Sequence, residues 1–226
     1  EEQTLQTKNE DGVVENTDKM FASVGVGDKE YKLLAKVSDF TKDGWKLEAL
    51  RNENATLVPG GKLEKDAFLT NKDGRKIGVI IRNLSDKNQK VSDCIVTKLS
   101  FSKEMFDGQI TLPGSLGFDS TEKELKAAGF KKDADGIYTY TSKKIKDDTI
   151  KAAMADGESV SEFTLERAVD ESSTSTGNAA ANTSVSTAAG SATTTASDSS
   201  SAEQNSATAD TTLINNSNSA SDAAEE

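Results

Sequence analysis

The large side chains of this sequence stop together at about residue 170, and this break constrains the fold most. Between Glu171 and Glu226 there is no lysine, arginine, proline or aromatic residue, and Leu213 and Ile214 are almost the only large aliphatics. Such a segment cannot bury enough apolar surface to offset the entropy lost on ordering. We therefore predict a disordered Ser/Thr/Ala-rich acidic tail over residues 171–226, acting as a spacer or as surface filler, and a folded region over 20–170, which is long enough for a stable core.

The charge is unevenly divided between these two parts. The tail holds seven of the 38 acidic residues and none of the 27 basic ones, so most of the net charge of −11 lies there. The remaining body has nearly balanced charges and no evident basic stripe. Nucleic-acid binding requires a basic face that displaces counterions from phosphate, and an anionic membrane requires a similar surface. We expect neither partner.

Cysteine and histidine usage excludes several kinds of site. The chain has one cysteine, Cys94, and no histidine. An intrachain disulfide, a zinc site of the usual Cys/His spacing and a histidine-activated nucleophile are therefore excluded. Residues 93–96 read as a buried strand, so Cys94 is interpreted as a small core side chain. We predict no catalytic residue, no metal site and no cofactor, although carboxylate and lysine chemistries stay open.

The N-terminal segment, residues 1–19, is acidic and rich in amides without periodicity, which predicts a flexible lead-in. No apolar stretch of transmembrane length occurs anywhere in the sequence. The first residue is Glu1 rather than Met, which is consistent with a removed signal segment or with trimming.

Strand signals dominate the centre of the sequence. β-branched and aromatic residues are enriched in several short segments separated by turn residues, and Asn71 to Gly74 has the composition of a tight hairpin turn. The predicted strands are residues 29–34, 67–69, 76–82, 94–101, 137–141 and 161–166. An antiparallel meander is the simplest arrangement of these strands.

The predicted helices are short. Thr121 and Glu124 have the spacing of a capping box, and Gly129 fits the position just after a helix, so residues 119–129 form the clearest helix. Ser38 and Asp39 offer an N-cap for a short helical turn that ends at Gly44, and residues 147–154 are a further candidate. Together these elements predict an α+β fold.

The two helix ends resemble each other. Residues 39–46 and 124–131 share a short helix, a glycine, an aromatic residue and a lysine, with the glycines 85 residues apart (129 − 44). Two ordinary helix ends would explain this, because a hydrophobic residue often packs back after such a glycine. The alternative is a true duplication, with halves at about 20–105 and 106–170.

Three segments, residues 39–47, 77–96 and 110–130, resemble a group of uncharacterised cell-surface lipoproteins of Gram-positive bacteria. The group has a Leu-Pro-Gly-Gly turn before a small helix and a strand hairpin, whereas this chain has Ser115 at the second glycine. The resemblance implies a tethered, extracellular or envelope-attached binding module. It also implies membrane attachment only through a lipidated N-terminal cysteine, which is not present here.

Glycine and acid patterns do not indicate a ligand site. Gly25-Val26-Gly27 lacks the other residues of a phosphate-binding loop, and the acids at 133–135 lack the remainder of a calcium loop. The candidate contact aromatics are Trp45, Phe130, Tyr138 and Tyr140, although the pattern favours a core position over a contact for each of them.

The leading hypothesis is a secreted or envelope-attached, non-catalytic module that binds a protein or glycan. Two alternatives remain open: a carboxylate-dependent enzyme acting on cell-wall or sugar polymers, and an inhibitor-like, two-repeat protein-binding module.

Overall fold

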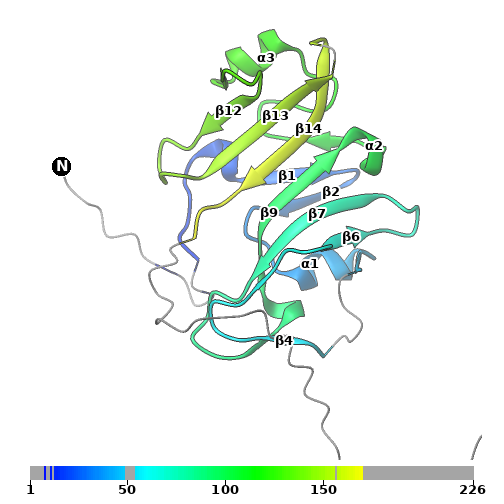
Figure 1. The fold of residues 1–226 in the computed structure, drawn as a ribbon, viewed down its shortest axis with the longest axis vertical. Helices are drawn as coiled ribbons and strands as arrows, with labels where there is room; N and C mark the ends of the chain where they lie inside the picture. Colours follow the sequence, from blue (N-terminus) through cyan, green and yellow to red (C-terminus); the bar gives the residue numbers. More distant parts are fainter. Residues whose placement is uncertain (1–7, 9–10, 12, 49–53, 156, 170–226) are drawn as a thin grey trace, which may run out of the picture. The chain divides into compact units, whose positions relative to one another are not determined.

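The computed structural model describes residues 8, 11, 13–48, 54–155 and 157–169. Backbone contacts divide the chain into two units, residues 1–185 and 186–226, and all described residues belong to the first. The predicted tail lies outside the described residues, as does most of the lead-in. The described part is mostly antiparallel sheet with three short α-helices, so the predicted sheet-rich α+β class is confirmed (Figure 1).

One large antiparallel sheet forms most of the fold (Figure 1). Its strands, from one edge to the other, are β11 (Lys131–Lys132), β12 (Tyr138–Thr141), β13 (Thr149–Ala155), β14 (Ser159–Glu166), β9 (Ile95–Ser102), β7 (Lys76–Arg82), β6 (Phe68–Thr70) and β3 (Lys46–Leu47). A further strand, β5 (Lys62–Leu63), pairs with the far end of β7. The longest strands are therefore central and the shortest lie at the edges.

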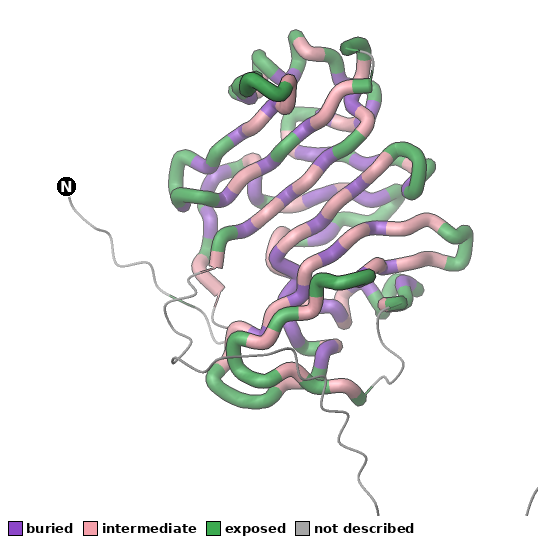
Figure 2. The backbone as a smooth tube through the Cα atoms, viewed as in Figure 1, coloured by how far each residue is buried: buried purple, intermediate pink, exposed green. Residues whose placement is uncertain are grey.

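Alternating burial along the strands explains why this sequence forms a sheet. In β7 every second residue is buried, and β9 and β14 follow similar patterns (Figure 2). Successive side chains of a strand point to opposite faces, so this alternation places one face of the sheet on the core and leaves the other outward. Ile77, Leu99, Ile150 and Phe163 are fully or almost fully buried on the inner face.

A second, smaller sheet contributes to the same core. It consists of β10 (Ile110–Thr111), β1 (Ser23–Val26) and β2 (Lys29–Lys32). Its buried residues, including Val24 and Tyr31, belong to one hydrophobic cluster with the inner face of the large sheet. A third sheet pairs only β4 (Thr56–Leu57) with β8 (Gln89–Lys90).

The helices are α1 (Val37–Lys42), α2 (Lys103–Phe106) and α3 (Glu122–Ala127), with short 3-10 turns η1 (Lys19–Phe21) and η2 (Val91–Asp93). The predicted capping box of α3 is confirmed: Thr121 and Glu124 bond each other's backbone N–H groups. The predicted N-cap of α1 is wrong, because α1 begins after Lys36. The carboxylate of Asp39 accepts the N–H of Lys36 at 3.0 Å.

The predicted helix over residues 147–154 is also wrong. Residues 149–155 form β13, which pairs with β12 on one side and with β14 on the other. Its alanines and Met154 suit a helix by propensity, but two neighbouring strands supply backbone partners along its length. Tertiary pairing therefore overrides local preference here.

The strand pairing is symmetric about the centre of the large sheet. Strands β9 and β14 pair with each other, and the middle pair is Ser100 with Thr164. On one side of the centre, the pairs between β7 and β9 include Gly78–Ser100, Val79–Leu99 and Ile80–Lys98. On the other side, the pairs between β13 and β14 include three that match these, Lys151–Thr164, Ala152–Phe163 and Ala153–Glu162.

Even the irregularity in the register occurs at matching places. The pairing shifts after Ile80 in β7 and after Ala153 in β13. Helices α1 and α3 precede the two sides, and each is followed by a left-handed glycine and a short edge strand. The match ends at the outermost pairs, because Lys46 pairs with Thr70 whereas Lys131 pairs with Thr139.

Candidate functional site

The outward side of the large sheet, called the outer face here, has no described helix or second sheet packed on it (Figure 1). All of its side chains are half-buried or exposed. The outer face comprises Phe68, Thr70, Lys76, Gly78, Ile80, Lys98, Ser100, Ser102, Thr139, Thr141, Thr149, Lys151, Ala153, Glu162, Thr164 and Glu166.

A row of mostly short side chains crosses the middle of the outer face. Paired positions place Gly78 beside Ser100, Ser100 beside Thr164, and Thr164 beside Lys151. These four strands span about 14 Å, because neighbouring strands lie about 4.8 Å apart. A methyl group at Gly78 would lie 3.3 Å from the Ser100 Cβ, which is a tight contact, so a glycine fits here where a larger side chain would crowd its neighbour. The surface is low in relief and rich in hydroxyl groups.

Charged residues of both signs stand on the outer face and at its rim. The Lys76 ammonium lies 3.1 Å from the Glu48 carboxylate and 5.7 Å from the centre of the Phe68 ring. Lys98 lies 3.5 Å from Glu166 across the β9–β14 pair. Exposed ion pairs of this kind contribute little to stability, about 0–1 kcal/mol each. Their main effect is to make the outer face polar without making its charge predominantly positive or negative.

The four candidate contact aromatics do not lie on the outer face. The exposed fractions of Trp45, Phe130, Tyr138 and Tyr140 are 7%, 3%, 1% and 5%. Trp45 stacks near Phe106, and the Phe130 and Tyr140 rings are 5.6 Å apart. All four are core residues, which is the placement that the sequence analysis favoured over a contact role. The outward aromatic on the large sheet is instead Phe68, which the sequence analysis placed in a strand without assigning its face.

Cys94 is fully buried between η2 and β9. Burial raises the pKa of its thiol to about 12, with Asp93 adding to the effect. A thiol that stays protonated at neutral pH is a poor nucleophile. The geometry therefore gives Cys94 a packing role.

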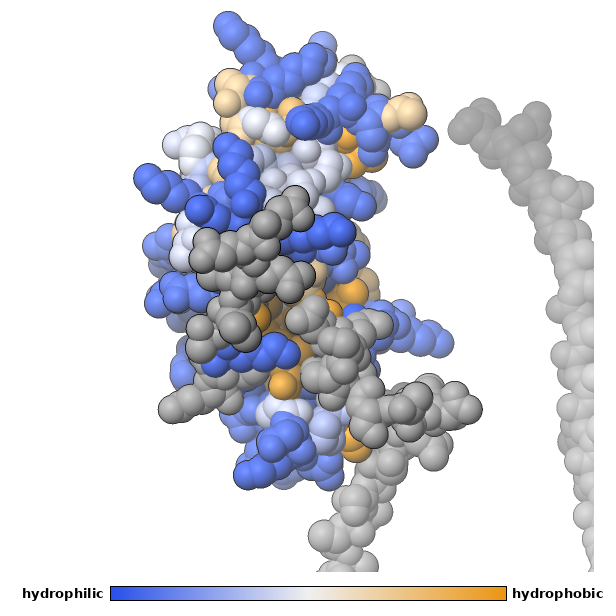
Figure 3. Space-filling view, turned by 90° about the vertical axis from the view of Figure 1, so that its left-hand side faces the viewer, coloured by the Kyte–Doolittle hydropathy of each residue, from blue (hydrophilic) through white to orange (hydrophobic). Residues whose placement is uncertain are grey.

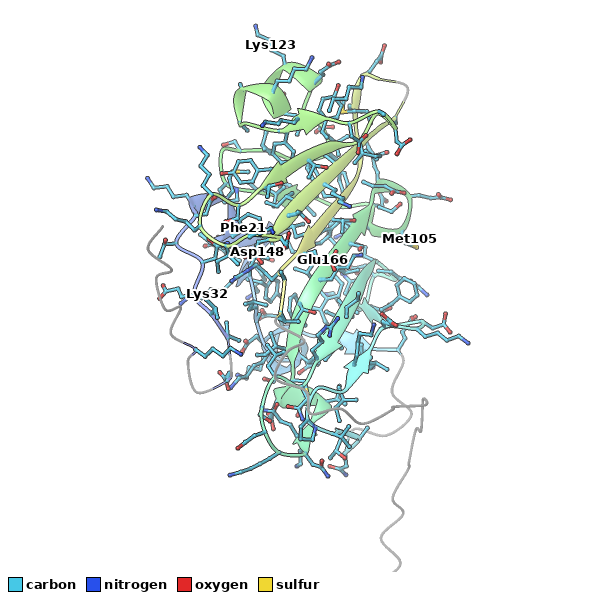
Figure 4. The ribbon with its side chains drawn as sticks, turned by 60° about the vertical axis from the view of Figure 1, so that its left-hand side comes forward. Phe21, Lys32, Met105, Lys123, Asp148 and Glu166 are labelled. Atoms are coloured by element: carbon cyan, nitrogen blue, oxygen red, sulfur yellow. The ribbon has the colours of Figure 1, made fainter. Side chains whose placement is uncertain are left out.

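A buried polar cluster lies where three separate segments meet. It comprises Asn16, Asp18, Ser142, Asp148 and Arg167, all at most 9% exposed. Asp148 forms an ion pair with Arg167 and accepts hydrogen bonds from the Asn16 amide at 2.7 Å and from the Ala168 N–H at 2.7 Å. Figure 4 labels Asp148, which directly precedes β13. These contacts occupy the carboxylate of Asp148 fully.

Asp18 plays a similar part at the other end of the polar cluster. Its carboxylate accepts hydrogen bonds from the Tyr140 hydroxyl at 3.0 Å, the Lys143 N–H at 3.0 Å and the Met20 N–H at 3.1 Å. Burial acts to raise the pKa of Asp18, but these donors outweigh it and hold the pKa below its ordinary value. Asp18 is therefore a charged structural group, shielded from solvent by its partners.

Other surface features give weaker indications of a site. A hollow of about 510 Å³ is lined by Leu34, Lys36, Asp39 and Ile95 among others, and its rim carries the 2.9 Å ion pair between Lys36 and Asp11. The side of the molecule in Figure 3 shows mainly hydrophilic residues, with a smaller hydrophobic area near the middle. Among the described residues no group of three acids or cysteines is placed to hold a metal ion.

No helix within the described ranges is long and apolar enough to cross a membrane. The chain matches no protein-family model, and neither the curated proteins nor the solved structures contain a significant match to it.

Proposed function

We propose that this chain is a non-catalytic binding module, secreted or attached to the bacterial cell envelope, that contacts a protein through the outer face. The observation that carries the proposal is the outer face itself, a broad sheet surface that no described element covers. Its middle row offers glycine, hydroxyl and methyl groups at low relief. A partner surface can approach Gly78, Ser100 and Thr164 closely, because their side chains are short, and Lys151 adds a flexible cation at one end of the row.

A protein fits the outer face better than a glycan does. Sugar rings are commonly held by stacking on exposed aromatic side chains, and the outer face offers only Phe68, whose ring already has the Lys76 ammonium above it. Protein interfaces, in contrast, combine apolar, hydroxyl and charged groups in proportions close to those of ordinary surface. Gly78, Ser100, Ile80 and the neighbouring ion pairs supply such a mixture.

The symmetric pairing favours the inhibitor-like, two-repeat form of this proposal. Each side of the β9–β14 pair has a preceding helix, a left-handed glycine and four antiparallel strands of the large sheet, with the same register shift. The strands are β3, β6, β7 and β9 on one side and β11 to β14 on the other. Two ordinary helix ends would not account for matching registers several strands away. We propose that the two sides arose by duplication and that together they form one continuous contact surface.

The envelope location rests on the resemblance to Gram-positive surface lipoproteins. The described Leu112–Leu116 bridge places a tight turn at the Leu-Pro-Gly-Ser segment, with Gly114 and Ser115 both left-handed. A turn of this kind is compatible with the family motif, in which glycine occupies the second of these positions.

The test is capture of envelope and secreted proteins from the source organism on the immobilised full chain. Thr164→Arg places a long cation in the middle of the outer face, and Thr41→Arg makes the same change on the exposed side of α1. We expect a defined protein to bind the wild type and Thr41→Arg, and to bind Thr164→Arg at least about tenfold more weakly, since buried unpaired charge is costly at an interface.

If Thr164→Arg and Thr41→Arg bound the protein equally well, the outer face would not be the contact surface. Hydrolysis of a cell-wall or sugar polymer by the purified chain would instead support the carboxylate-dependent enzyme.

A further inference from the structure

The N-terminal strap, defined as residues 13–18, is attached to the body by polar contacts. Among the residues that the structure describes, the strap has no ladder pairing with either larger sheet, and one isolated bridge joins Val14 to Lys8. Its Val14 carbonyl accepts a hydrogen bond from the Arg167 guanidinium at 2.8 Å, and its Asn16 amide donates to the Ser142 hydroxyl at 3.0 Å. The strap is thus held by side chains of the 142–148 loop and of the segment after β14.

The polar cluster joins these attachments into one network. Asn16 also donates to Asp148 and accepts the Asp18 N–H at 2.9 Å, and Asp148 is in turn paired with Arg167. Because each group serves two or more others, the loss of one leaves several buried groups unpaired. A buried polar network is rigid while every group has its hydrogen-bond partners. When one group is removed, the remaining groups lose partners together.

The strap has only the half-buried Val13 and Val14 as apolar anchors, and the first fully buried apolar side chain follows the strap. Phe21 is 2% exposed and its ring lies 6.2 Å from that of Tyr140. Residues 13 and 15 within the strap are half-buried or exposed. The strap therefore depends on the polar cluster, while Phe21 keeps the following turn on the core. Regions held in this way open at lower free energy than the central strands of a sheet.

We infer that the polar cluster is a latch, which locks the strap to the 142–148 loop and to Ala168, and which releases all three together while the large sheet stays folded. The latch fastens the start of the described chain to its end, since Arg167 directly follows β14 (Figure 1). Val14 and Arg167 are thereby held together, and opening the latch separates them.

Native-state hydrogen exchange on the full chain tests this inference. The reporters are the N–H groups of Asp18, Lys143 and Ala168, which donate within the polar cluster, and those of Leu99 and Phe101 in β9. In the wild type we expect the three cluster reporters to share one opening free energy that is lower than that of β9. A shared value identical to that of β9 would overturn the latch, because the strap would then open only with the whole sheet.

Asp148→Asn sharpens the test by removing the charge that pairs with Arg167. We expect exchange of all three cluster reporters to rise by about tenfold or more while β9 exchange stays slower than theirs, because Arg167 is left buried without its partner. Asp147→Asn is the matched control, since Asp147 is exposed and its left-handed backbone, at φ 74°, suits asparagine. Acceleration of the Ala168 reporter alone would contradict a shared latch.

Discussion

Two left-handed glycines terminate the helices that precede the two sides of the large sheet. Gly44 and Gly129 have φ values of 90° and 99°. After each glycine, an aromatic N–H donates to the carbonyl five residues earlier, Trp45 to Phe40 at 3.2 Å and Phe130 to Leu125 at 3.0 Å. This geometry turns the chain back so that the aromatic enters the core.

Replacing either glycine with alanine is expected to destabilise the protein by about 1 kcal/mol, because a Cβ is strained in left-handed backbone. The two losses are expected to be similar, since neither Cβ would meet a neighbour closer than 3.4 Å. Urea unfolding monitored by Trp45 fluorescence measures both. Gly44→Asn serves as the control and should lose less, because asparagine tolerates this conformation. Unchanged stability in both alanine variants would contradict the assigned role.

The buried phenol of Tyr31 is expected to make the free energy of unfolding fall at alkaline pH. Burial raises the pKa of its phenol, and the hydrogen bond to Asp43 at 2.9 Å raises it further. An unfolded tyrosine releases its proton near its ordinary pKa, about 10, while the folded one retains it. The free energy of unfolding must therefore fall as pH rises above about 10.

We expect Tyr31→Phe to show less of this fall between pH 9 and about 10.5 while losing about 1 kcal/mol at neutral pH, because Trp45 loses its acceptor. Equilibrium unfolding at the two pH values measures the difference. A wild-type protein whose stability does not change over this range would refute the assignment.

The helices and strands differ in how clearly the sequence signals them. The capping box of α3 and the β-branched runs of β7 and β9 are local patterns, and both were predicted close to their observed positions. β13 was missed because Ala152, Ala153 and Met154 favour a helix, and its strand character comes from two neighbours distant in sequence.

Capping of α3 gives a prediction at this scale. The Thr121 hydroxyl accepts the Glu124 N–H, and the Glu124 carboxylate accepts the Thr121 N–H at 2.7 Å. Thr121→Ala is expected to lower the free energy of unfolding by about 1 kcal/mol, as for other N-caps. Thermal unfolding by circular dichroism measures this change, with Thr41→Ala on α1 as an exposed control. A larger loss in the control would show that capping is not the cause.

The candidate site could be predicted only in part. Which strand residues point outward follows from alternation, but which face stays uncovered depends on where β1, β2 and the helices pack. The polar cluster was missed, because Asn16 and Asp18 lie in a polar stretch predicted to be a flexible lead-in. Asn16 and Asp148 are 132 residues apart, and no local pattern links them.

At the scale of the whole molecule, the two sides of the large sheet carry corresponding core residues. Ile77 and Ile150 occupy matching positions in β7 and β13, and both are 0% exposed. On the outer face the matching residues differ, for example Gly78 and Lys151. Matching inner positions such as Ile77 and Ile150 are both buried and hydrophobic, whereas matching outer positions such as Gly78 and Lys151 can differ in size and charge.

Matching positions should respond alike to the same change. Ile77→Ala and Ile150→Ala are each expected to lower the free energy of unfolding by about 2–5 kcal/mol, because each leaves a cavity in the same core. Denaturant unfolding of the two variants measures this, with Ile80→Ala on the outer face as a control that should lose less. Loss of structure on one side only, with the other still folded, would show that the sides are separate folding units.

The Ser100–Thr164 pair lies at the boundary between the two matching sides of the large sheet. A substitution there alters both sides at once, while one at Gly78 or Lys151 alters a single side. The outward residues of one side can therefore change without altering the matching surface on the other side. Under the proposed binding function, changes to outward residues alone would give such a molecule a second binding preference, while its interior stays the same.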